Sequence, residues 1–184
     1  MPIKHIFLDM DGVLSDFFSA ALRIHGRLEL LDEWPRGQRD IPGVLGLSRR
    51  AYWNKIDEQG SVFWASLQPY PWLDELIQAA REVAPFTILT APSLAPGCSE
   101  GKIRWMYEYF PKVEGRSFAN YMIGSQKHLL AQPGHLLIDD SESNTDAFNS
   151  SGGQAILFPQ VWNRNHAVCS PVEYVKSKLA EFAR

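Results

Sequence analysis

The sequence predicts an α/β fold: a doubly wound, Rossmann-like parallel sheet of about five strands, with a small helical cap inserted after the first strand. Two observations carry this prediction. Short apolar runs recur along the chain, bounded by acidic residues, glycine or proline, as in buried parallel strands. Between them lie segments whose apolar residues repeat about every 3.6 positions, as in helices. Strands that alternate with helices in this way are typical of a doubly wound core.

Five apolar runs are expected to form the strands. In chain order they are Ile3 to Leu8, Phe86 to Leu89, Tyr121 to Ile123, Leu136 to Ile138 and Ala155 to Phe158.

Three segments between and after these runs have helical spacing. Their apolar positions are Leu73, Leu76, Ile77, Ala80 and Val83; then Ile103, Met106, Tyr107 and Phe110; and finally Val172, Val175, Leu179 and Phe182. The last helix is expected to begin at Pro171, with Ser170 as its N-cap, because proline suits the first helical position.

The interval from residue 16 to residue 69 does not continue this alternation. It is rich in aromatic and charged residues and contains the turn signals WPRG and IPG. We therefore expect a helical cap over 16–69 and a core domain formed by 1–15 and 70–184. An insertion directly after the first strand rises from the carboxyl edge of the sheet, where it can exclude water and select substrates.

Composition excludes several functional classes. The chain has 184 residues and a formal net charge of -3, and no run of lysine and arginine could follow a phosphate backbone, so polymeric nucleic acid is not an expected partner. No apolar stretch approaches the roughly 20 residues of a membrane span. Cys98 and Cys169 show no metal-type spacing, and neither a signal peptide nor a transit peptide is expected. A cytoplasmic protein is expected, and its assembly stays open, a homodimer included.

The first strand ends in the letters DMDG. Side chains two residues apart in an extended strand share a face, so Asp9 and Asp11 are expected to converge at its carboxyl end. Ligands bind at that edge of open α/β sheets, and a divalent cation relieves the repulsion between two carboxylates. Gly12 allows the sharp turn that follows. An ordinary strand exit with solvated acids remains the alternative for this motif alone.

Three further segments place polar residues after later runs: Thr90 with Ala91, Lys127, and Asp139 with Asp140. Taken singly, these are a cap, a solvated cation and N-caps of a helix. Taken together, four ends of one parallel sheet bring acids, a hydroxyl and a lysine to one crevice, which suits phosphoryl transfer.

This ordered set resembles the haloacid dehalogenase superfamily. Its four motifs match Asp9 with Asp11, Thr90, Lys127, and Asp140 with Asn144. The second acid, Asp11, distinguishes phosphatases from dehalogenases in that superfamily, so the resemblance implies phosphoryl chemistry.

A narrower resemblance is to the 5'(3')-deoxyribonucleotidase family. It rests on DMDGVLSDF at 9–17, FWASLQPYP at 63–71, ILTAPSLAPGCSEGKIRW at 88–105 and LLIDD at 136–140. One departure is that Ser125-Gln126 precede Lys127 where vertebrate members carry Arg-Asp, so an arginine near the phosphate or sugar is missing.

The resemblance implies a role for each matching residue. Mg²⁺ is expected on the Asp9 carboxylate, the Asp11 backbone carbonyl and the Asp140 side chain, with Asp139 behind these ligands. Asp9 is then the nucleophile and Asp11 the general acid and base. The groups expected to hold the phosphate are Thr90, the backbone N–H of Ala91, Lys102 and Lys127.

The implied substrate is a (deoxy)nucleoside monophosphate, which is hydrolysed to nucleoside and phosphate. Four aromatic residues of the insertion are candidates for stacking on the base: Phe17, Trp34, Phe63 and Trp64. Each of them could equally belong to the small core of the cap. Two other functions stay open: a phosphatase for another small phosphate ester, such as a sugar phosphate, and a non-catalytic nucleotide-binding domain.

Overall fold

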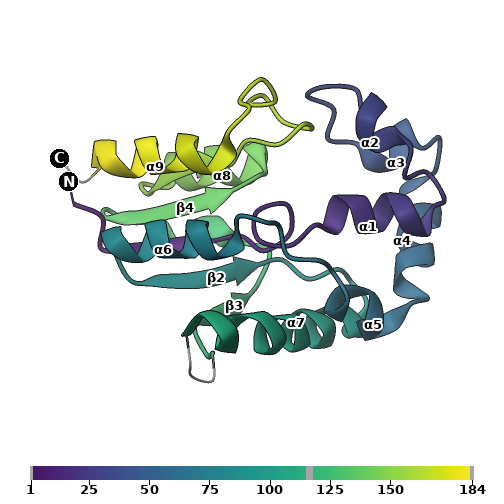
Figure 1. The fold of residues 1–184 in the computed structure, drawn as a ribbon, viewed down its shortest axis with the longest axis horizontal. Coiled ribbons are helices and arrows are strands. Elements are labelled where there is room, and N and C mark those ends of the chain that lie inside the picture. Colours follow the sequence, from purple (N-terminus) through teal and green to yellow (C-terminus); the bar gives the residue numbers. More distant parts are fainter. Residues whose placement is uncertain (1, 115–117, 183–184) are drawn as a thin grey trace.

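A parallel five-stranded sheet forms the centre of the protein, as the sequence predicts (Figure 1). The computed structural model describes residues 2–114 and 118–182, so the outermost positions of the predicted core, 1, 183 and 184, lie outside the described residues. The strand order is β3-β2-β1-β4-β5. The strands are β1 (His5–Leu8), β2 (Phe86–Thr90), β3 (Tyr121–Ile123), β4 (His135–Asp139) and β5 (Gln154–Leu157).

The strand order reverses at β1, which lies between β2 and β4. Leu8 pairs with Ile88 on one side and with Ile138 on the other, so the ends of the three central strands are in register. The residues that follow these pairs therefore meet at one edge. A crevice at such a reversal point is where open α/β sheets bind ligands.

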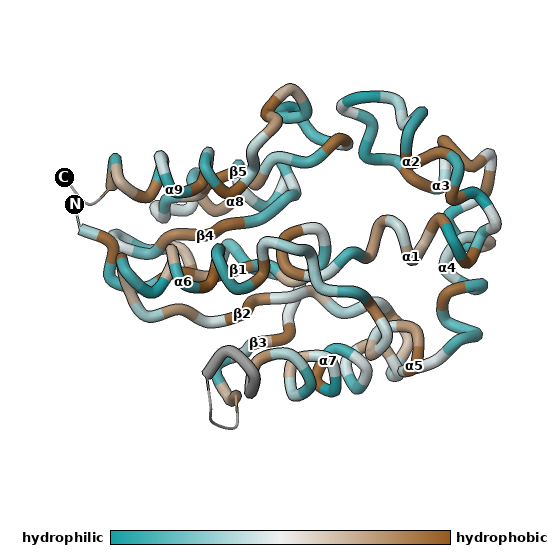
Figure 2. Tube along the Cα trace, in the orientation of Figure 1, coloured by the Kyte–Doolittle hydropathy of each residue, from teal (hydrophilic) through white to brown (hydrophobic). Residues whose placement is uncertain are grey.

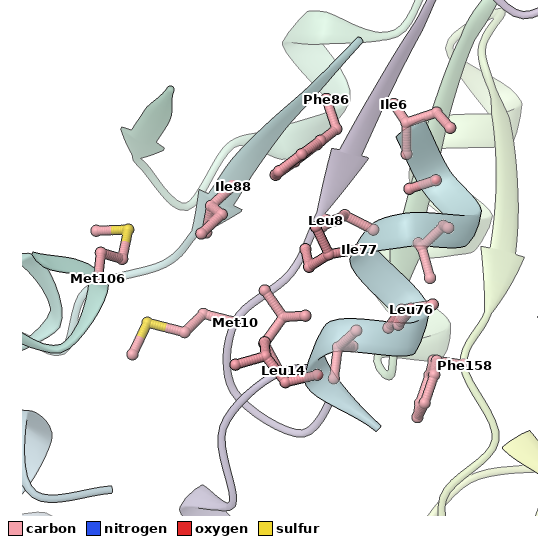
Figure 3. Packing of buried hydrophobic residues seen from close by; sticks show 14 of the residues in the cluster. Ile6, Leu8, Met10, Leu14, Leu76, Ile77, Phe86, Ile88, Met106 and Phe158 are labelled. Carbon is pink, nitrogen blue, oxygen red and sulfur yellow. The ribbon is translucent and has the colours of Figure 1, made fainter. Parts of the chain in front are cut away.

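Helices cover both faces of the sheet because the central strands are apolar on both sides. Ile6 and Leu8 of β1 face α6 (Leu73–Val83), as Figure 3 shows, and α7 (Pro96–Glu114) and α9 (Pro171–Phe182) pack into the same cluster. Phe7 points to the opposite face, toward α8 (Glu142–Ser150). Burying one such side chain stabilises the fold by about 1.5–3 kcal/mol. In Figure 2 the colour alternates between brown and teal along α6 and α9, as in helices with one apolar side.

Strand β3 was predicted to be buried, but it is partly exposed. It is an edge strand with β2 as its one neighbour in the sheet, and the Met122 side chain is 45% exposed. The apolar letters of Tyr121 to Ile123 predicted the strand but not its place at the edge.

The interval after β1 is helical, as expected. Its helices are α1 (Phe17–Ile24), α2 (Leu30–Glu33), α3 (Ile41–Val44), α4 (Arg49–Asp57) and α5 (Gly60–Ala65). Helices α1 to α4 lie beyond the carboxyl edge of the sheet, at the right of Figure 1. Asp16 caps α1 by accepting a hydrogen bond from the backbone N–H of Ser19 at 2.9 Å, and Ser48 caps α4 in the same way.

The two connections between this helical segment and the sheet run side by side. Ser15 pairs with Pro69 in an antiparallel bridge, and the backbone N–H of Asp16 donates to the carbonyl of Gln68 at 2.8 Å. The chain thus leaves and re-enters the core at one place.

Helix α5 packs closely against α7. A Cβ atom added at Gly101 of α7 would lie 2.5 Å from Cβ of Trp64 on α5, so only glycine allows this approach.

In the part of the chain that the structure describes, no helix combines the length and apolar character needed to cross a bilayer.

Candidate active site

Asp9 follows the last residue of β1 and is buried at the carboxyl edge of the sheet. Its Oδ1 atom accepts hydrogen bonds from the backbone N–H of Met10 at 2.8 Å and from Nζ of Lys127 at 2.7 Å. Oδ2 has no hydrogen-bond partner among the described residues. Burial, followed by the nearby Asp139 carboxylate, raises the pKa of Asp9 to about 7 although Lys127 opposes this shift.

Lys127 lies between two carboxylates. It begins the short 3-10 helix η1 (Lys127–Leu130), and Nζ lies 2.7 Å from Oδ1 of Asp9 and 2.6 Å from Oδ2 of Asp139. Burial disfavours its charged form, but Asp9 and Asp139 outweigh burial and raise the pKa of Lys127. Lys127 is therefore a fixed positive charge at the floor of the site.

Asp139 is held from several sides at the end of β4. Besides Lys127, it accepts hydrogen bonds from the backbone N–H of Ser141 at 2.8 Å and from the Asn144 side-chain amide at 3.0 Å. Ser141, and neither of the two aspartates, is the N-cap of α8. These contacts fix the orientation of the Asp139 carboxylate.

Asp140 faces the cap and the loop that follows β5. Its Oδ2 atom accepts a hydrogen bond from the indole Nε1 of Trp162 at 2.6 Å and contacts a guanidinium nitrogen of Arg39 at 3.3 Å. Burial raises the pKa of Asp140, and Arg39 opposes this shift. Gly12 supports the arrangement, because a Cβ atom there would lie 2.8 Å from Cγ of Asp140.

Three carboxylates at this edge could hold a cation. One oxygen each from Asp9, Asp139 and Asp140 lies within 4.8 Å of the others. Carboxylate oxygens are the ligands that Mg²⁺ prefers. Burial first, and the Asp139 carboxylate second, raise the pKa values of Asp9 and Asp140, so a cation would stabilise their charged forms. The side chains therefore fit a divalent ion. The cluster contains Asp139 in addition to the predicted Asp9 and Asp140; Asp11 was expected to contribute only its backbone carbonyl.

Asp11 and Lys102 form a second ion pair beside the first. Nζ of Lys102 lies 2.6 Å from Oδ2 of Asp11, 2.7 Å from Oγ1 of Thr90 and 2.6 Å from the carbonyl oxygen of Ala91. The Ser15 hydroxyl donates to the other carboxylate oxygen of Asp11 at 3.2 Å. The structure thus brings the predicted residues of β1, β2 and α7 together.

Lys102 was predicted to contact the phosphate, but in the structure its ammonium group contacts other groups of the protein. The side chain is fully buried, and its three contacts use all three N–H donors of an ammonium group. Neither Lys102 nor the buried Thr90 is among the described residues that line the cavity, whereas Ala91 is.

A cavity of about 1030 Å³ lies between the edge of the sheet and the helical segment. Asp9, Asp11, Lys127 and Asp140 line its floor. The cap contributes both aromatic and basic side chains to its walls: Phe17, Tyr52, Trp53, Trp64, Arg39, Arg49 and Arg50. Its size is at the upper end of typical ligand pockets.

The structure separates the four aromatic candidates for base stacking. Phe17 and Trp64 line the cavity, with their rings stacked on each other at 5.4 Å between centroids. Trp34 and Phe63 are not among the described residues that line it, and they are 4% and 5% exposed. Trp34 packs in a small cluster with Phe18 and Trp162 and donates its indole N–H to the carbonyl of Gln38, whereas Phe63 belongs to the main hydrophobic cluster. For these two residues the structure favours the packing role that the sequence left open.

Trp53 and Arg39 are among the cavity residues that sequence reasoning missed. Trp53 is 36% exposed and stacks on Phe17 at 6.1 Å between centroids. Arg39 reaches Asp140 from 101 positions away in the sequence. An isolated tryptophan or arginine in a helical insertion carries no local signal, since its role depends on how the cap folds back over the sheet.

The departure from the family pattern lies outside the cavity wall. Ser125 and Gln126 are exposed and directly precede η1, and they are not among the described residues that line the cavity. The cavity obtains basic side chains from the cap instead, Arg39 among them.

Comparisons with known proteins agree with this geometry. The model of the family "5' nucleotidase, deoxy (Pyrimidine), cytosolic type C protein" matches residues 2–176. A curated relative from Staphylococcus epidermidis, whose provisional name is 5'(3')-deoxyribonucleotidase, is 28% identical over 171 residues, which cover 90% of this chain and 88% of that protein.

Solved structures share the fold. A HAD family hydrolase from Deinococcus radiodurans, solved with bound phosphate and sodium, aligns with a TM-score of 0.59 and 16% identity over 98% of this chain and 96% of that one. The HAD-hydrolase YfnB of Bacillus subtilis, bound to magnesium, aligns with a TM-score of 0.53 and 15% identity over 84% of this chain and 86% of that one.

Proposed function

Since the chain belongs to the deoxy (pyrimidine) type C family of 5' nucleotidases, and is thereby a phosphatase of the HAD superfamily, we propose that it hydrolyses (deoxy)nucleoside monophosphates in an Mg²⁺-dependent reaction. The observation that carries the proposal is a pair of carboxylates, Asp9 and Asp11, each with its own lysine, in one large cavity. A non-catalytic nucleotide-binding domain would not need this arrangement.

In the first step, Asp9 attacks the phosphorus atom. Oδ1 of Asp9 is engaged by Met10 and Lys127, which leaves Oδ2 as the attacking oxygen. A bond forms between Oδ2 and phosphorus while the bond from phosphorus to the sugar oxygen breaks, and Asp11 donates its proton to that departing oxygen. The products are the nucleoside and an aspartyl phosphate.

In the second step, water resolves the aspartyl phosphate. Asp11, now a carboxylate, accepts a proton from the water as its oxygen attacks phosphorus, and the bond between phosphorus and Asp9 breaks. Phosphate leaves and both carboxyl groups return to their starting states. Two easier displacements replace one difficult hydrolysis.

Asp9, Asp140 and the backbone carbonyl of Asp11 would hold the Mg²⁺, and Asp139 would support them from behind. A bound Mg²⁺ supplies positive charge that offsets the phosphate and the carboxylates. Lys127 adds a fixed positive charge near the transferring group, and the backbone at Ala91 offers N–H donors to its oxygens.

The helical segment 16–69 acts as the cap of a core formed by 1–15 and 70–184. It excludes water from the site and supplies the walls that hold the nucleoside. Phe17, Trp53 and Trp64 are the aromatic rings at hand for the base, and stacking on such rings contributes about 1–3 kcal/mol per base.

A screen of phosphate esters tests this function. Purified protein is incubated with deoxy and ribo nucleoside monophosphates, as both 5' and 3' esters, and with sugar phosphates, and released phosphate is measured with Mg²⁺ and with EDTA. The proposal expects Mg²⁺-dependent release that is fastest from a nucleotide. Faster release from sugar phosphates would show that the substrate is another small phosphate ester and not a nucleotide. No release from any ester would refute phosphatase activity.

A further inference from the structure

Lys102 is a charged residue without any exposed surface. It lies on α7 between Glu100 and Arg104, which form an exposed ion pair with each other. The Lys102 side chain instead points inward, to Asp11 after β1 and to Thr90 at the end of β2. Burying an ammonium group is costly unless it is fully paired and hydrogen-bonded. Its surroundings must therefore supply specific partners.

The partners of Lys102 are groups of the active site. Its three donors go to Oδ2 of Asp11, Oγ1 of Thr90 and the carbonyl of Ala91, at 2.6 to 2.7 Å. Because the Thr90 hydroxyl accepts from Lys102, its own proton stays available for donation. No donor of Lys102 remains for a substrate oxygen.

The cap seals this cluster from above. Nζ of Lys102 lies 5.0 Å from the ring centroid of Trp64, at a distance typical of a cation–π contact. Trp64 belongs to α5, which approaches α7 closely at Gly101, one residue before Lys102. The ammonium group is thus enclosed by protein, and Trp64, one of the residues around it, lines the cavity.

We propose that Lys102 is a positioning residue that holds the carboxylate of Asp11 and the hydroxyl of Thr90 in place for the reaction, rather than a ligand of the phosphate. The inference rests on the proposed function, in which Asp11 exchanges a proton with the leaving oxygen. A fixed carboxylate matters there because proton transfer requires the two heavy atoms to lie within hydrogen-bond distance. Lys102 thus acts through Asp11.

Leaving-group dependence distinguishes these two roles. The Lys102→Met variant keeps an unbranched side chain under Trp64 and removes the charge. If Lys102 positions Asp11, kcat for a nucleotide falls about 100-fold or more, the lower range for a lost general acid. The loss is much smaller with p-nitrophenyl phosphate, whose leaving group needs little protonation, and the inhibition constant of inorganic phosphate stays within about threefold of wild type.

A double-mutant cycle with Asp11→Asn adds the decisive comparison. When two residues act as a unit, the effects of substituting them do not add. Adding Lys102→Met to the Asp11→Asn variant should therefore reduce kcat only slightly more. The control is Met106→Leu, a conservative change on the same helix at another fully buried position, for which unchanged kinetics are expected. Equal losses with both substrates, joined by weaker phosphate inhibition, would overturn the inference and make Lys102 a phosphate ligand.

If Lys102→Met folds too poorly for kinetics, thermal unfolding still tests the coupling between Lys102 and Asp11. That variant leaves the Asp11 carboxylate without its cation, whereas the double variant with Asn at position 11 leaves no unpaired charge. The double variant should melt at a higher temperature than Lys102→Met alone; additive destabilisation would refute the coupling. If the wild-type protein hydrolyses no nucleotide, the proposed function is refuted. The melting temperatures would still test whether Lys102 is coupled to Asp11.

Discussion

Gly12 offers a sharp test of how the backbone after β1 makes room for Asp140. Gly12 has φ near 80°, and a Cβ atom there would lie 2.8 Å from Cγ and Oδ2 of Asp140 and 3.1 Å from Cζ2 of Trp162. Gly12→Ala therefore forces both an unfavourable backbone conformation and a collision with a candidate metal ligand.

The size of the effect follows from these two terms. A left-handed conformation costs an alanine about 1–2 kcal/mol, and overpacking of a filled site costs about 1–3 kcal/mol more. Together they predict about 2–5 kcal/mol of lost stability. For a chain of this size, Tm falls by about 2–4 °C per kcal/mol, which gives a decrease of about 4–20 °C.

Gly26 supplies a matched control. It also has positive φ, at 70°, but an added Cβ would meet nothing within 4 Å. Gly26→Ala should lose only the backbone term of about 1–2 kcal/mol, or about 2–8 °C. Both variants are compared by thermal unfolding with and without MgCl₂, and by phosphate release from a nucleotide.

Gly12→Ala should lose more stability than Gly26→Ala, gain less from MgCl₂ and release phosphate more slowly. Equal melting temperatures for the two variants, together with full activity of Gly12→Ala, would refute the account of Gly12 as space for Asp140.

Three further substitutions test individual contacts of the site. Asp11→Asn should slow nucleotide hydrolysis about 100-fold or more but affect p-nitrophenyl phosphate less, because only the nucleoside needs a proton to leave; equal losses would contradict a general acid. Arg39→Ala removes a positive charge 3.3 Å from Asp140, and calorimetry should show Mg²⁺ binding about fivefold more tightly. This factor corresponds to about 1 kcal/mol, the repulsion between charges in a water-like dielectric. Unchanged or weaker binding would show that Arg39 does not oppose the ion. Trp162→Phe keeps an aromatic side chain, smaller than the indole, but removes the Nε1 donor at 2.6 Å from Asp140, so Mg²⁺ should bind about 10- to 100-fold more weakly. Native affinity would show that this hydrogen bond does not orient the carboxylate.

Sequence patterns predict the sheet well because its strands are short, apolar and buried. The run from Leu136 to Ile138, for example, has the same composition on both faces, as a central parallel strand requires. Strand β3 shows the limit of this reasoning, since Met122 is apolar but lies exposed on an edge. Strand order depends on pairings between distant segments, which local composition does not record.

The floor of the site could also be predicted, because its residues follow strands that must end at one edge. Asp9 and Asp140 are examples. The walls could not, since they depend on how the cap packs. Trp34 and Trp53 are both tryptophans of the insertion, yet the first is buried in the cap and the second lines the cavity. Lys102 was recognised as part of a family segment, but only the three-dimensional contacts show that its donors are already used.

The account depends most directly on Asp9 as the nucleophile. The decisive measurement is the rate of phosphate release from a deoxynucleoside monophosphate at saturating Mg²⁺, for the wild-type protein and for Asp9→Asn, with thermal unfolding as a check that both are folded. We predict steady turnover by the wild type, within the usual range of about 1 to 10³ per second, and none by a folded Asp9→Asn protein. A folded Asp9→Asn variant that retains near-native turnover would contradict the account.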